Sequence, residues 1–130
     1  TDQRFLSDYC FIRIEAPFFL YVEALVEQNN LSAAKTALED FMHDYRDPSY
    51  TLTATTQAAM RDEVRIQRRI ELWGEGTSFF DFKRWHLGVD RNEAGSNHTF
   101  MVKVPAGDKR WVYQIPQDEI ESNSQMVQNE

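Results

Sequence analysis

The segment from residue 68 to residue 85, RRIELWGEGTSFFDFKRW, most constrains the fold of this chain, because it sets ionic residues into an apolar helical pattern. Its large apolar side chains are expected to bury one continuous face, and they are Leu72, Trp73, Phe79, Phe80, Phe82 and Trp85. The arginines and glutamates between them must point outward or find partners of opposite charge, since burying an unpaired charge is costly. The segment therefore predicts helices that are joined partly by ion pairs.

Length and composition bound the class of protein. A chain of 130 residues, 42% of them hydrophobic, can build one core, so we expect a single domain over residues 1–130 that buries roughly two-thirds of its unfolded surface. The formal charge of −7 disfavours nucleic acid as a partner, because phosphates would be repelled. The longest apolar run, residues 16–20, is far shorter than the ~20 residues of a membrane-spanning helix. We also expect that any targeting signal would precede Thr1.

The first half of the chain predicts a helical hairpin over residues 11–46. One helix should run from about Phe11 to Glu27, either beginning near Ala16 with Pro17 in its first turn, which we prefer, or kinking at Pro17. A second helix, capped by Ser32, should reach about Tyr45. The inward-facing positions are expected to be Phe11, Ile14, Phe18, Tyr21, Val22, Leu25 and Val26 in the first helix and Ala34, Ala37, Leu38, Phe41 and Met42 in the second. Small residues where the helices would approach, Ala24, Ala34 and Ala37, are typical of tetratricopeptide-like hairpins.

The second half predicts two further helices and then a β-hairpin. Thr56 should cap a helix reaching about Gly74, with Met60, Val64, Ile66, Ile70 and Trp73 inside, and another helix should end near Leu87 with Gly88 as a left-handed cap, so that residues 56–88 form one helical block. Residues 99–104 and 110–115 read as the strands of a β-hairpin within 99–116, before a tail over 117–130. The fold class is therefore mainly α, with tetratricopeptide-like helical hairpins and a small C-terminal β-hairpin.

The acidic residues of the opening segment allow two interpretations. Glu71 and Glu75 lie four residues apart and Asp81 follows, so a general acid and base could be imagined there. However, Arg68 and Arg69 precede the glutamates, and a nearby cation keeps a carboxylate ionised. We therefore predict no catalytic residue and a structural ion network instead, made of Arg69, Glu71, Glu75, Asp81 and Arg84.

The sequence offers no support for a metal or cofactor site. His43, His86 and His98 share no ligand spacing, and the single cysteine, Cys10, reads as a small buried hydrophobe between Tyr9 and Phe11. No glycine-rich phosphate loop or nucleophile elbow is present, so we expect no cofactor.

The aromatic residues are the remaining candidates for ligand contact. Trp111 and Tyr113 would share one face of the second predicted strand, which could be either a platform for a ligand or a packing surface against Phe100 or Val102. We name Trp111 and Tyr113 as weak ligand-binding candidates.

Three blocks of the sequence resemble one family. Residues 68–85 are similar to the pattern R-R-x-E-L-x-x-E-G-x-x-x-x-D-x-x-R-W, residues 113–123 to y-x-I-P-x-x-E-I-x-x-N with a later Q-N at 128–129, and residues 13–25 to a preceding helix R-x-x-E-x-Y-L-x-x-A-E-A-L. Together these blocks resemble the C-terminal portion of SusD/RagB proteins, the nutrient-binding surface lipoproteins of Bacteroidetes.

The resemblance implies a non-catalytic protein that binds a polysaccharide or oligosaccharide and delivers it to a SusC-like TonB-dependent transporter. It implies a surface-exposed position at the outer membrane, a lipid anchor on a cysteine upstream of this chain, and a mainly scaffolding role for this segment. A general helical-repeat scaffold for protein partners is the alternative. A glycoside-active enzyme is disfavoured because the carboxylates are flanked by arginines.

Overall fold

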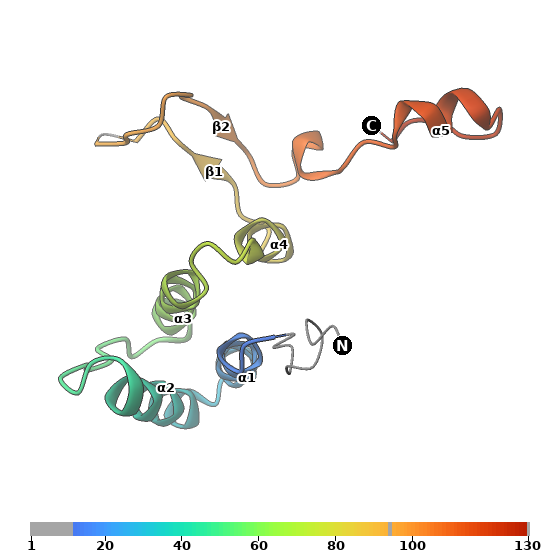
Figure 1. Ribbon diagram of the computed structural model, residues 1–130. Helices are drawn as coiled ribbons and strands as arrows, with labels where there is room; N and C mark the ends of the chain where they lie inside the picture. The colour runs from blue at the N-terminus through green and yellow to red at the C-terminus, as the bar shows by residue number, and fades with distance from the viewer. Residues whose placement is uncertain (1–11, 94, 130) are drawn as a thin grey trace, which may run out of the picture. The chain divides into compact units, whose positions relative to one another are not determined.

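The computed structural model describes residues 12–93 and 95–129, and these form two compact units, one ending at Gly76 and one beginning at Thr77 (Figure 1). The helices are α1 (Glu15–Glu27), α2 (Leu31–Tyr45), α3 (Gln57–Glu71), α4 (Thr77–Arg84), a 3-10 helix η1 (Lys109–Trp111) and α5 (Gln117–Ser122). The two strands are β1 (Val89–Asp90) and β2 (Lys103–Val104). The predicted fold class, mainly α with a small antiparallel hairpin, is confirmed.

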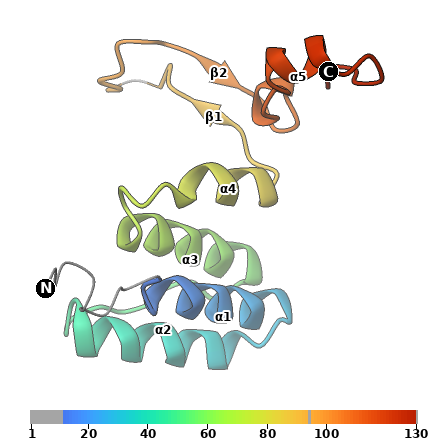
Figure 2. The same cartoon turned by 45° about the vertical axis from the view of Figure 1, so that its right-hand side comes forward.

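In the first unit, α1 packs against both α2 and α3. α1 and α2 run antiparallel (Figure 2), because the chain reverses within a few residues at Asn29, whose φ of 58° lies in the left-handed region. The core consists of Phe19, Val22, Val26, Ala34, Leu38, Met42, Leu52, Met60 and Val64. The predicted helical hairpin is therefore present, with one further helix completing its core.

The helix ends follow ordinary capping rules. Pro17 is the third residue of α1, in the first turn, where its missing N–H costs nothing, as predicted. Thr56 caps α3 as predicted, its hydroxyl accepting from the Ala59 N–H at 3.2 Å. The cap of α2 is Asn30 and not Ser32, since the Asn30 side chain accepts from the Ala33 N–H at 3.4 Å.

Several expected core positions are exposed. Phe19 takes the buried place in α1 that was expected for Ile14 and Tyr21, and Ala24 is also exposed. In α3 the buried row is Met60, Val64 and Arg68, which are spaced four residues apart. Ile66 and Ile70 lie on the other side of α3, because two residues correspond to about 200° of rotation at 3.6 residues per turn. Trp73 is 86% exposed because α3 ends at Glu71, and Phe80 of α4 is also exposed.

The loop between α2 and α3 is irregular, but it is fixed at Leu52, whose side chain enters the core. Lys35 Nζ donates to the Leu52 carbonyl at 2.7 Å, and the Leu52 N–H donates to Glu39 Oε1 at 2.9 Å. Lys35 and Glu39 also pair with each other at 2.5 Å. Two side chains of α2 therefore satisfy both backbone groups of a buried loop residue.

The second unit corrects the predicted β-hairpin. The partner of β2 is β1, with Val89 opposite Val104 and Asp90 opposite Lys103, so residues 110–115 are not the second strand. The Asp108 carboxylate accepts from the Arg110 N–H at 2.9 Å and starts η1, which takes Arg110 and Trp111 out of the extended conformation.

The end of α4 also differs from the prediction. α4 ends at Arg84, and the left-handed residue is His86, with a φ of 53°. Gly88 is required for another reason, since a Cβ there would lie 2.7 Å from the Val104 carbonyl oxygen.

None of the helices in the described part of the chain has the length and apolar character needed to cross a bilayer. Cys10 and Phe11, which were expected to be buried, lie outside the described residues.

Candidate functional site

Charged side chains converge at one end of the three-helix unit. We call them the charged cluster: Arg13, Glu15, Arg46, Glu71 and Glu75. Arg13 and Glu15 stand at the start of α1, while Arg46 follows the last residue of α2. Glu71 ends α3, and Glu75 lies in the turn after it. The cluster thus joins all three helices.

Glu71 is the centre of this cluster. Its carboxylate accepts hydrogen bonds from Arg46 Nε at 2.7 Å on one oxygen and from Arg46 Nη2 at 2.5 Å on the other. Arg13 Nη2 donates to the same carboxylate, and Arg13 Nη1 donates to the Glu71 carbonyl at 3.2 Å. The Glu71 side chain is only 9% exposed, while the two arginine side chains are 39% and 37% exposed.

Each guanidinium also binds further acids: Glu75 and Glu15 for Arg13, and Glu15 for Arg46. Arg13 Nη1 lies 2.5 Å from a Glu75 carboxylate oxygen, and Arg13 Nε lies 3.3 Å from a Glu15 carboxylate oxygen. Arg46 Nη2 donates to the other Glu15 carboxylate oxygen at 3.4 Å. Three carboxylates therefore share two guanidinium groups.

The electrostatics follow from these contacts. Hydrogen bonds from Arg46, and then the charges of Arg46 and Arg13, hold the pKa of Glu71 below its ordinary value although burial opposes this. Hydrogen bonding from Arg13 likewise lowers the pKa of Glu15. The pKa of Arg46 is raised by its hydrogen bonds to Glu71. An acid held ionised cannot donate a proton at neutral pH, so Glu71 is suited to binding cations and not to acid catalysis.

The predicted ion network is distributed over both units. Glu71 and Glu75 belong to the charged cluster, where sequence reasoning had placed Arg68 and Arg69 as their partners. Arg68 is buried and donates to the Ala16 carbonyl of α1 at 2.9 Å, and Arg69 lies on the exposed side of α3. Arg13 and Arg46 were missed, because they stand 58 and 25 residues before Glu71 and no local spacing links them.

Asp81 and Arg84 form their own pair in the second unit. Arg84 Nε donates to Asp81 Oδ1 at 2.9 Å, and Asp81 is 3% exposed. The Arg84 guanidinium also lies over the ring of Trp85, 4.8 Å from its centroid. The pair therefore fixes one turn of α4.

Trp111 and Tyr113 occupy different environments. Trp111 is 8% exposed, its ring lies 5.4 Å from Phe79 and 6.4 Å from Phe82, and its indole N–H donates to the Pro105 carbonyl at 2.8 Å. Packing against α4 thus replaces the expected packing against Phe100 or Val102. Tyr113 touches Phe79 at 5.2 Å between ring centroids but is 72% exposed. Of the two candidates, Tyr113 is the one with a ring open to a ligand.

The end of the chain is attached to the segment that carries Tyr113. The Gln128 side chain accepts from the Ile115 N–H at 2.8 Å and donates to the Ile115 carbonyl at 3.0 Å. Asn129 Nδ2 donates to the Tyr113 carbonyl at 2.8 Å. These are the two residues of the Q-N pair noted in the sequence, and they pair as the backbone of a neighbouring strand would.

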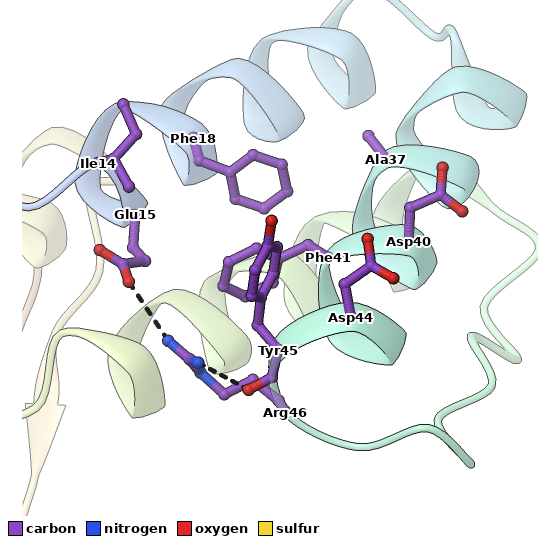
Figure 3. Close-up of a pocket in the computed structure, with 9 residues that line it drawn as sticks. All are labelled: Ile14, Glu15, Phe18, Ala37, Asp40, Phe41, Asp44, Tyr45 and Arg46. Atoms are coloured by element: carbon purple, nitrogen blue, oxygen red, sulfur yellow. Dashed lines mark hydrogen bonds and ion pairs between the residues drawn. The ribbon is translucent and has the colours of Figure 1, made fainter.

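A pocket of about 450 Å³ lies between α1 and α2, beside the charged cluster (Figure 3). Phe18, Phe41 and Tyr45 form its aromatic surface, and Asp40 and Asp44 stand on one side of these rings. Glu15 and Arg46 stand on the other side, so the pocket and the charged cluster share these two residues.

The described residues contain no group of three or more histidine, cysteine, aspartate or glutamate side chains placed to hold a metal ion. His43 Nε2 lies 2.7 Å from the Tyr50 carbonyl oxygen, an ordinary contact between a side chain and the backbone.

Comparison with known proteins identifies one family. The family model of the SusD family, which describes the sequences of its members, matches residues 7–130 of this chain. No curated protein and no solved structure matched the chain in the two other comparisons.

Proposed function

Because this chain belongs to the SusD family, we propose that it is part of a non-catalytic protein that captures glycans or related nutrients at the bacterial outer membrane. The match over residues 7–130 is the observation that carries this proposal. The partners proposed with it are a polysaccharide or oligosaccharide ligand and a SusC-like TonB-dependent transporter. The proposed location is the cell surface, with a lipid anchor on an upstream cysteine.

Within such a protein we assign this segment mainly a scaffolding role. The charged cluster supports that assignment, because its hydrogen bonds join the ends of α1, α2 and α3. We propose the predicted network of Arg69, Glu71, Glu75, Asp81 and Arg84 as scaffold as well. Tyr113 is the residue of this segment that we propose for ligand contact, since its ring is exposed.

The first experiment tests partner and location together. The tagged protein is isolated from detergent-solubilised outer membranes, and the proteins that accompany it are identified by mass spectrometry. A TonB-dependent transporter is the expected partner. Recovery from the soluble fraction with other helical proteins would instead support the alternative, a general helical-repeat scaffold, which the antiparallel pair of α1 and α2 also suits.

The second experiment tests binding without catalysis. Affinity electrophoresis against a panel of polysaccharides should show retardation, and the same mixtures should release no new reducing ends. Tyr113→Ala should weaken retardation without changing the melting temperature, whereas Phe100→Ala, at another exposed ring, should leave it unchanged. Hydrolysis that is abolished by Glu71→Gln at an unchanged melting temperature would contradict the proposal.

A further inference from the structure

The pocket between α1 and α2 has a surface that suits a cation with an apolar stem. We propose that it binds a lysine or arginine side chain of a peptide segment in a protein partner. This inference stands on the pocket alone and does not depend on glycan binding.

The aromatic surface supplies the first argument. The rings of Phe18 and Phe41 are stacked, 4.6 Å between centroids and 25° apart, and the Tyr45 ring lies 5.7 Å from that of Phe41. Tyr45 is 67% exposed, so its ring is open to a partner. Aromatic faces attract ammonium and guanidinium groups within about 6 Å of the ring centroid. The Arg46 guanidinium already lies 5.3 Å from the Phe41 centroid, so this surface does accept a cation.

The carboxylates beside the rings supply the second argument. Asp40 and Asp44 lie four residues apart on α2, on the same edge of the helix, and both are exposed. Among the described residues, no hydrogen bond or ion pair involves either carboxylate. Two like charges at this spacing repel each other, and a cation between them relieves the repulsion.

The charge of the pocket selects the sign of the occupant. Glu15, Asp40 and Asp44 give three negative charges against the one positive charge of Arg46, a formal charge of −2. Arg46 is already engaged by Glu15 and Glu71, which leaves the aspartates to attract a partner. The whole chain carries −7, so a basic partner is also favoured at longer range.

The size and polarity of the pocket favour a basic side chain. Its volume of about 450 Å³ falls in the range of small-ligand sites, roughly 300–1,000 Å³. The methylene stem of lysine or arginine would lie along the rings, and the charged head would stand between Asp40 and Asp44. A bare amine would use the carboxylates but leave the rings empty.

The test is a titration of the ¹⁵N-labelled chain with tetralysine, followed by NMR. We expect the shifted amides to cluster in residues 14–18 and 37–46. Tetralysine acetylated on every Nε keeps the stems and loses the charges, and it should bind at least about tenfold more weakly, because the ion pairs and the cation–π contacts are both removed.

Matched variants separate the pocket from general acidity. Asp40→Asn with Asp44→Asn should weaken tetralysine binding about tenfold, whereas Asp62→Asn with Asp118→Asn, the same change of charge outside the pocket, should weaken it less than about threefold. Tyr45→Leu should also weaken binding, and circular dichroism checks that each variant is folded. Equal effects of the two double variants, or binding of a glucosamine tetramer in place of tetralysine, would overturn the proposal.

Discussion

Arg46, which follows the last residue of α2, binds Glu71, the last residue of α3, at two points. Arg46 Nε donates to one Glu71 carboxylate oxygen at 2.7 Å, and Arg46 Nη2 donates to the other at 2.5 Å. An acid at the C-terminal end of α3 is unfavourable by itself, because the helix dipole places partial negative charge there. The guanidinium groups of Arg46 and Arg13 offset that cost. Glu71 therefore depends on residues of two other segments, and its removal affects all three helices.

Glu71→Ala should destabilise the first unit by about 1–3 kcal/mol. This lies between the values for a buried and an exposed pair, because Glu71 is 9% exposed while its arginine partners remain nearly 40% exposed. Urea denaturation followed by circular dichroism measures the change. Asp62→Ala is the control, since Asp62 is 74% exposed and 3.8 Å from Arg65, and it should cost less than about 0.5 kcal/mol. Equal costs for the two variants would mean that the charged cluster does not stabilise the fold.

Acid should weaken the fold through the same carboxylates. The folded-state pKa values of Glu71 and Glu15 lie below the ordinary value of 4.5, so their contribution is fully present above that value and is lost as the pH falls through the lowered folded-state pKa. Melting temperatures measured from pH 7 down to pH 2 should therefore drop below about pH 4.5. Glu71→Gln should show a smaller drop, and an identical pH profile in both proteins would contradict this assignment.

Gly88→Ala should destabilise the second unit by about 1–3 kcal/mol, because the new methyl group would lie 2.7 Å from the Val104 carbonyl oxygen. Gly95→Ala is the comparison, since a Cβ there meets open space and only the left-handed backbone, with a φ of 87°, opposes it. Tryptophan fluorescence during urea denaturation reports on this unit through the buried Trp85 and Trp111, because Trp73 of the first unit is already 86% exposed in the folded state. A smaller loss for Gly88→Ala than for Gly95→Ala would show that the close approach to Val104 is not limiting.

Gln128→Ala should release the end of the chain from Ile115. The Ile115 N–H would lose its acceptor, so its hydrogen exchange should accelerate at least about tenfold, the change expected when a bond worth ~1.4 kcal/mol is removed. NMR exchange rates measure this directly. Gln125→Ala, at an exposed position in the same tail, should leave the Ile115 rate unchanged.

The helices of the first unit could be predicted because their signals are local. Thr56 caps α3, Pro17 falls in the first turn of α1, and the apolar spacing of α2 selects Leu38 and Met42 for the core. The predictions were wrong where tertiary contacts decide which side of a helix is buried. Ile66 and Ile70 fit a helical period, but Arg68 takes the buried side of α3 because its guanidinium binds the Ala16 carbonyl.

For the same reason, only part of the charged cluster could be predicted from the sequence. Glu71 and Glu75 stood out from their spacing, whereas Arg13 and Arg46 approach them only after the helices pack. The prediction of a second strand at residues 110–115 was wrong for a local reason. The Asp108 side chain accepts a hydrogen bond from the Arg110 N–H and starts a 3-10 turn where an extended run was expected. Sequence periodicity therefore predicts the helices well, whereas ion pairs between residues far apart in the sequence can be identified only once the fold is known.

The fixing of Leu52 by Lys35 and Glu39 has a consequence for how this unit can change in length. One anchored residue divides the connection between α2 and α3 into two short spans, 46–51 and 53–56, each with its own closure entropy. Lengthening the first span at its exposed residues, 47–49, alters only a short loop and leaves the second span in place, so insertions of a few residues there should cost little. The connection between these helices can therefore vary in length at residues 47–49, while Arg46, Leu52 and Thr56 hold the helices in register.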